Sequence, residues 1–159
     1  MSVALWRIAQ ETRDYRADDM SGAGAAKVGG RWNSPGKAMV YTASSAALAY
    51  LESLAHLGRE APRNRFLIRV EVPKAIWKKA ARVTEKELPK IWRADPVGMS
   101  SMQFGDKWLD AGQAALLCIP SVIVPEDINV LINPEHPDAE FAQAHIARQL
   151  LFDPRVLQL

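Results

Sequence analysis

An arginine, a tyrosine and a glutamate follow one another closely in the chain, at Arg31, Tyr41 and Glu52, behind the glycine pair Gly29 and Gly30. The planar guanidinium of an arginine matches phosphate oxygens and stays charged, and glycines beside it let backbone amides approach the same anion. A tyrosine ring can stack on an aromatic base, and a carboxylate can stabilise positive charge that grows on a sugar carbon. These residue types suit a dinucleotide whose glycosidic bond is to be broken.

Each of these residues also has an ordinary structural interpretation. Arg31 can pair with Glu52, Tyr41 can belong to the core, and Glu52 can cap a solvent-exposed edge. The spacing alone leaves both interpretations open, so the elements that carry the three side chains matter.

Hydrophobic periodicity indicates how these residues are positioned. Residues 38–42 read as a strand, and Ser44 is suited to cap a helix that runs to His56 and stops at Gly58. In this helix Glu52 falls at the edge of the apolar stripe, where a half-buried carboxylate can have its pKa and hydrogen bonding controlled. The stripe consists of Ala47, Leu48, Leu51, Leu54 and Ala55.

The remaining pattern predicts a single α+β domain over residues 1–159, with five or six short strands and two or three helices. Residues 18–30 read as a glycine-rich loop, and residues 102–111 as a helix stopped by Gly112. Residues 137–146 are ambiguous between helix and strand, and residues 74–91 are irregular to helical. The further expected strands are 3–9, 65–72, 127–132 and the apolar stretch 114–124, which Pro120 and Ser121 break.

Composition narrows the class of protein. Twenty positive side chains against eighteen negative ones give a net charge of +2, which predicts no strong field for nucleic acid. The lone Cys118 cannot form an internal disulfide, which favours a reducing compartment. With no long apolar run, a soluble cytoplasmic protein without membrane contact is expected. A rival interpretation makes the basic residues Lys78, Lys79 and Arg82 a nucleic-acid-binding face.

Several kinds of catalytic site are disfavoured. The three histidines show no metal-ligand spacing, and Cys118 lies in an apolar stretch, so no metal is expected. No Gly-x-Ser-x-Gly elbow occurs. The glycines Gly22 and Gly24 lead into a strand instead of opening a helix, unlike the dinucleotide fingerprint of Rossmann proteins.

The sequence resembles the RES domain family, which is named for an arginine, a glutamate and a serine. These three residues match Arg31, Glu52 and Ser121 here. The resemblance covers nearly the whole chain in the right order. It rests on the segments 6–8 (Trp-Arg-Ile), 29–33 (Gly-Gly-Arg-Trp-Asn), 40–43 (Val-Tyr-Thr-Ala), 48–52 (Leu-Ala-Tyr-Leu-Glu), 119–121 (Ile-Pro-Ser), 129–134 and 153–155 (Asp-Pro-Arg).

That resemblance implies a toxin of a type II toxin-antitoxin module, with mixed β-sheets like those of ADP-ribosyltransferase toxins and NAD as its substrate. It implies that Glu52 is the catalytic carboxylate, that Tyr41 packs on the nicotinamide side, and that Ser121 supports the site by hydrogen bonding. The NAD-binding set it implies is Arg7, Gly30, Arg31, Trp32, Asn33 and Tyr41, with the two arginines toward the phosphates or ribose.

The resemblance leaves the acceptor open. Water or phosphate would give NAD glycohydrolysis or phosphorolysis, and a protein side chain would give ADP-ribosyl transfer. It also implies a cognate antitoxin, a small Xre-like DNA-binding protein that blocks the NAD cleft. Residues 74–99 offer no functional interpretation.

Overall fold

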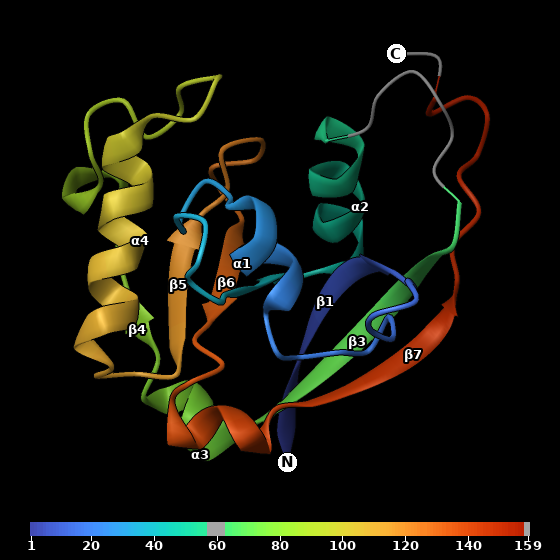
Figure 1. Ribbon diagram of the computed structural model, residues 1–159, viewed down its shortest axis with the longest axis horizontal. Coiled ribbons are helices and arrows are strands. Elements are labelled where there is room, and N and C mark those ends of the chain that lie inside the picture. Colours follow the sequence, from blue (N-terminus) through green and yellow to red (C-terminus); the bar gives the residue numbers. More distant parts are fainter. Residues whose placement is uncertain (57–62, 158–159) are drawn as a thin grey trace.

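The computed structural model describes residues 1–56 and 63–157, which form a mixed seven-stranded sheet with four α-helices (Figure 1). The strand order is β4-β5-β6-β2-β1-β3-β7, with β4 parallel to β5 and every other neighbouring pair antiparallel. The strands are β1 (Ser2–Gln10), β2 (Val40–Ala43), β3 (Arg65–Pro73), β4 (Ala81–Arg82), β5 (Leu116–Pro120), β6 (Ile128–Ile132) and β7 (Gln143–Gln149). The helices are α1 (Ala23–Val28), α2 (Ala46–Ala55), α3 (Lys74–Lys78) and α4 (Met99–Ala111), with 3-10 turns at Glu85–Glu87 and Pro137–Phe141.

The sheet consists of two well-paired halves, β4-β5-β6-β2 and β1-β3-β7, which meet at one point. Strand β1 pairs with β3 along its whole length, whereas its pairing with β2 is limited to Trp6 opposite Ala43. Continued pairing would place Tyr41 opposite Ile8, but the two strands part before that position. The junction therefore leaves a gap between β1 and β2 inside an otherwise continuous sheet.

Apolar side chains bury this junction from both faces. On one face the largest core cluster joins Leu5 and Ile68 of one half to Val40 and Leu116 of the other. On the other face Leu48 and Ala49 of α2 pack with Ala43 and Trp6, so α2 covers the junction itself. Figure 1 shows α2 at the end of β1 and α4 beside β5.

Strand β5 and helix α4 enclose a second, aromatic core. Trp32 packs against Trp92 and Phe104, with ring centroids 6.4 and 5.9 Å away. Gly105 allows this contact, because a Cβ at that position would lie 1.7 Å from the Trp32 carbonyl oxygen. The loop that carries Arg31 is thereby held against α4.

The α+β class and most of the expected elements are confirmed, but the glycine-rich loop is partly wrong. Residues 23–28 form α1, because three alanines favour helix there. Gly29 ends this helix with φ 75° and donates its N–H to the carbonyl of Ala25. Residues 122–124 form no second strand after Pro120, and the ambiguous 137–146 region contains both a 3-10 turn and the start of β7.

The helix that carries Glu52 also differs in detail. Its N-cap is Ser45, whose Oγ accepts from Leu48 N at 3.1 Å, whereas the expected cap Ser44 donates its N–H to Ile128. The buried positions are Leu48 and Ala49; of the expected stripe, Ala47, Leu51 and Ala55 are exposed. The predicted stop at Gly58 lies outside the described residues. Glu52 itself is half-buried, as the periodicity predicts.

Among the helices of residues 1–56 and 63–157, none combines the length and apolarity that crossing a membrane requires.

Candidate active site

Tyr41 on β2 organises the loop that precedes it. Its hydroxyl donates to Asn33 Oδ1 at 2.6 Å and accepts from the Trp32 N–H at 3.0 Å. Gly30 gives the hydroxyl its space, since a Cβ there would lie 2.6 Å from the oxygen. Burial raises the pKa of the Tyr41 phenol, so it stays neutral across the physiological range. The hydroxyl already donates its proton to Asn33 and accepts from Trp32, so the ring is the main part of Tyr41 that the pocket offers to a ligand.

Asn33, which accepts the hydrogen bond from the Tyr41 hydroxyl, is completely buried. Its amide nitrogen donates to the carbonyls of Ala25 and Lys37, both at 2.9 Å. The residue therefore ties α1 to the approach to β2, and its side chain has no group left to contact a ligand. Of the expected NAD-binding residues, Asn33 and the buried Trp32 act as the support of the site.

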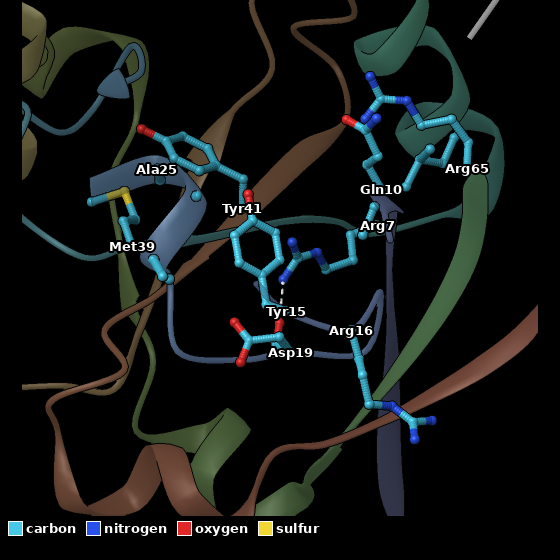
Figure 2. Close-up of a pocket in the computed structure, with 14 residues that line it drawn as sticks. Arg7, Gln10, Tyr15, Arg16, Asp19, Ala25, Met39, Tyr41 and Arg65 are labelled. Carbon is cyan, nitrogen blue, oxygen red and sulfur yellow. Dashed lines mark hydrogen bonds between the residues drawn. The ribbon is translucent and has the colours of Figure 1, made fainter. Parts of the chain in front are cut away.

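Arg7 points into a pocket of about 270 Å³ that opens where β1 and β2 part (Figure 2). One guanidinium nitrogen donates to the backbone carbonyl of Asp19 at 3.1 Å. Burial lowers the pKa of Arg7, and the nearby Asp19 charge offsets this only partly. Within residues 1–56 and 63–157, no carboxylate forms an ion pair with Arg7. A half-buried cation without a paired anion favours binding of a negatively charged ligand.

Two tyrosines share this pocket with Arg7. In Figure 2 the Arg7 guanidinium extends toward Tyr15, Tyr41 and Asp19. Gly24 of α1 leaves room for Tyr15, whose hydroxyl would lie 3.3 Å from a Cβ at that position. The pocket thus offers a positive charge and two aromatic rings, which suits a phosphorylated aromatic compound.

A second cavity, of about 470 Å³, lies near the turn before β7. It is larger, but Glu135 and Glu140 are among the residues that line it. Like charges disfavour an anionic ligand there. The chemistry of the lining, and not the volume, therefore selects the pocket at Arg7 as the candidate site.

Glu52 on α2 is held rigidly by two donors. Its Oε1 accepts from Ser121 Oγ and from Asn129 Nδ2, both at 2.7 Å. Ser121 Oγ accepts from the N–H groups of Ile123 and Val124, both at 3.1 Å. Because these bonds occupy the oxygen of Ser121, its single proton is directed at Glu52. Within the described ranges Oε2 of Glu52 accepts no hydrogen bond, which leaves this oxygen for a ligand.

Arg31 lies in a different environment from Arg7. One guanidinium nitrogen donates to the carbonyls of Trp92 and Ala94, at 2.8 and 2.9 Å. Arg31 does not line the pocket at Arg7. It anchors the loop before β2 to the segment before α4. The roles of Arg31 and Glu52 toward a substrate remain predictions.

Several site residues carried no recognisable signal in the sequence. Asn129 completes the support of Glu52; it begins the segment 129–134 of the family resemblance, but the resemblance gave it no role. Tyr15 lines the pocket from a segment for which the sequence predicted no element, and Arg65 lines it from the start of an expected strand. Among the described residues no group of three His, Cys, Asp or Glu side chains could hold a metal ion.

Comparison with known proteins identifies the family to which the chain belongs. The RES domain family matches residues 4–153. The chain is 49% identical to the Prs ADP-ribosylating toxin of Sphingobium sp. (strain YBL2), with 99% of each protein covered. It is 34% identical to Toxin Res of Yersinia enterocolitica, with 96% of this chain and 98% of that protein covered. The chain therefore belongs to the RES domain family, the family of toxins that includes these relatives.

A solved structure supports the fold. The chain aligns with the crystal structure of the MbcT-MbcA toxin-antitoxin complex of M. tuberculosis at a TM-score of 0.61. The alignment covers 99% of this chain and 88% of that one, at 18% sequence identity. The mixed sheet is thus an architecture that another protein shares.

Proposed function

We propose that this protein is the toxin of a toxin-antitoxin module and that it cleaves the bond between nicotinamide and ribose in NAD. One observation carries the proposal: a rigidly held carboxylate, Glu52, and an arginine-lined pocket flank the same strand junction. The helix that bears Glu52 packs on the pair Trp6 and Ala43, and Arg7 and Tyr41 lie where β1 and β2 part beyond it. The names of the relatives, which include an ADP-ribosylating toxin, are consistent with NAD as substrate.

The bond that breaks joins the ribose C1′ to the pyridinium nitrogen of nicotinamide. Its electron pair leaves with the nitrogen, so the cationic ring becomes neutral nicotinamide and positive charge grows on the ribose. This leaving group needs no proton, and a carboxylate near the sugar stabilises the developing cation. Oε2 of Glu52 serves this purpose, while Ser121 and Asn129 fix Oε1. Water then adds to C1′ and loses a proton, which yields ADP-ribose.

The pocket residues supply substrate binding in this scheme. Arg7 binds a phosphate, since a half-buried guanidinium without a paired carboxylate among the described residues favours an anion. The Tyr41 ring packs on the nicotinamide side. Arg31 holds the loop from Gly30 to Asn33 in place through Trp92 and Ala94, and its remaining donors are available to the ribose or phosphates.

Nicotinamide release by Glu52→Gln tests the catalytic assignment. The amide keeps the shape of the side chain but removes the negative charge, and we expect release from NAD to fall by about a hundredfold or more. Glu126→Gln is the matched control, because Glu126 is an exposed carboxylate. Unchanged release by Glu52→Gln, with the wild type active, contradicts the assignment.

ADP-ribosyl transfer to a protein is the second candidate reaction. It uses the same bond cleavage with a protein side chain as acceptor, and the name of the Sphingobium relative favours it. Incubation with NAD labelled in the adenylate part and a cell lysate separates the two reactions. A labelled protein band indicates transfer, and free ADP-ribose without a labelled band indicates hydrolysis. Free ADP-ribose 1-phosphate, formed only when phosphate is present, indicates phosphorolysis.

A cognate antitoxin is the expected partner. The structural neighbour is a toxin-antitoxin complex, which supports this proposal. We propose a small Xre-like DNA-binding protein that covers the pocket at Arg7. Expression of this chain alone should deplete cellular NAD and stop growth, and co-expression of the protein encoded beside it should restore both. Persistent NAD loss with all neighbouring genes present contradicts the proposed partner.

A further inference from the structure

Three arginines line the candidate pocket, and they differ in how the protein uses their charges. Arg16 is exposed and pairs with Asp18 at 3.1 Å. Arg7 is half-buried and donates to a backbone carbonyl. Arg65 is half-buried, and its Nε is buried with no hydrogen-bond partner among the described residues. Because this Nε is enclosed by the protein, a ligand in the pocket reaches Arg65 through its terminal guanidinium nitrogens.

The backbone of Arg65 is fixed on both sides. It begins β3, its register partner is Gln10 at the end of β1, and its carbonyl accepts from the Leu150 N–H at 2.8 Å. In Figure 2 the Arg65 side chain lies beside Gln10 at one end of the pocket, whereas Arg7 extends toward Tyr15 and Asp19. The two guanidinium groups therefore reach the same pocket from neighbouring strands.

This arrangement leaves two positive charges facing one pocket. In the part of the chain that the structure describes, neither Arg7 nor Arg65 forms an ion pair with a carboxylate. The nearby carboxylate of Asp19 accepts from the N–H and hydroxyl of Ser21 instead. Two positive charges that line one pocket without carboxylate partners favour an anion with two negative charges.

We propose that Arg65 is a second phosphate-binding residue, which with Arg7 binds the diphosphate of the dinucleotide. The inference rests on the proposed function and adds to it a binding residue outside the arginine, glutamate and serine of the family name. Two guanidinium groups on separate strands suit two linked phosphoryl groups, because each phosphate can then accept from its own donor fork. The compound bound should therefore be a dinucleotide diphosphate, in preference to nicotinamide or ribose alone.

Binding of ADP-ribose, measured by calorimetry, tests this inference without depending on turnover. ADP-ribose carries the diphosphate and lacks nicotinamide. We expect Arg65→Ala to raise its Kd about tenfold or more and Arg65→Lys to recover part of the loss, since lysine keeps the charge but lacks the planar fork. Arg148→Ala is the matched control, because Arg148 is exposed on β7 and does not line the pocket, and its change should be under about twofold.

Kinetics supply the second readout. In Arg65→Ala the KM for NAD should rise by about the same factor as the Kd, with kcat nearly unchanged, and inhibition by nicotinamide should stay as in the wild type. Unaltered ADP-ribose binding by Arg65→Ala, or an equal loss of nicotinamide inhibition, refutes the role of Arg65 even when the wild type cleaves NAD. A wild type that binds ADP-ribose through Arg65 without cleaving NAD refutes the proposed reaction and leaves the diphosphate site supported.

Discussion

The hydroxyl of Tyr41 should contribute far more to stability than one hydroxyl ordinarily does. Tyr41→Phe keeps the ring but removes one donor and one acceptor. It leaves Asn33 Oδ1, completely buried, without its 2.6 Å donor, and the buried Trp32 N–H without its 3.0 Å acceptor. Each orphaned buried group costs about 1–3 kcal/mol. Since slight movement of the loop recovers part of this, we expect the free energy of unfolding to fall by about 2–4 kcal/mol.

Urea unfolding followed by tryptophan fluorescence measures this change. The matched control is Tyr50→Phe, because the Tyr50 hydroxyl donates to the Leu151 carbonyl at 3.0 Å at the protein surface. Water can replace that bond, so the control should lose less than about 1 kcal/mol. Equal losses in Tyr41→Phe and Tyr50→Phe would refute the reasoning that the Tyr41 hydroxyl is the structural link between β2 and the preceding loop.

Three further predictions follow from contacts of single residues. Gly105→Ala should destabilise the protein by about 2 kcal/mol or more, because its Cβ would lie 1.7 Å from the Trp32 carbonyl oxygen. Replacing glycine by alanine inside a helix usually raises the melting temperature. A higher melting temperature for Gly105→Ala would therefore contradict this prediction. Burial raises the pKa of Tyr41 above its ordinary value of 10.0, so above about pH 10 the unfolded chain binds fewer protons and stability falls as pH rises. Urea midpoints from about pH 9 to 11 should show a shallower fall in Tyr41→Phe. Ser121→Ala removes one donor to Glu52 and should lower kcat about tenfold with little change in KM; an unchanged kcat would count against the positioning role.

The sequence predicted the elements that depend on local pattern. Strands β1, β3 and β6 and the αL stop of α4 at Gly112 follow from hydrophobic runs and turn residues. Helix α1 was missed because it has six residues and no side-chain cap, so its glycines outweighed its alanines in the pattern. A helix this short is stabilised by its surroundings more than by its own sequence.

The site was predictable only in part, for a similar reason. Glu52 at the edge of its helix follows from periodicity, and the resemblance to the RES family supplied Ser121. Asn129 and Arg65 reach the site through sheet pairing between segments far apart in the chain, which no local pattern contains. The divergence of β1 from β2 likewise depends on how the two halves of the sheet pack.

The single bridge between β1 and β2 has a consequence for the conformational entropy that the protein loses when a ligand binds. Core residues from both halves, such as Leu5 and Val40, lie in one cluster beneath the gap, so the halves cannot move apart without exposing it. The gap is therefore a fixed notch, and its charged groups are in place before a ligand arrives. A preorganised site loses little conformational entropy on binding. Affinity should then depend on the fit of the ligand's charges and rings, with little contribution from closure of the protein around it.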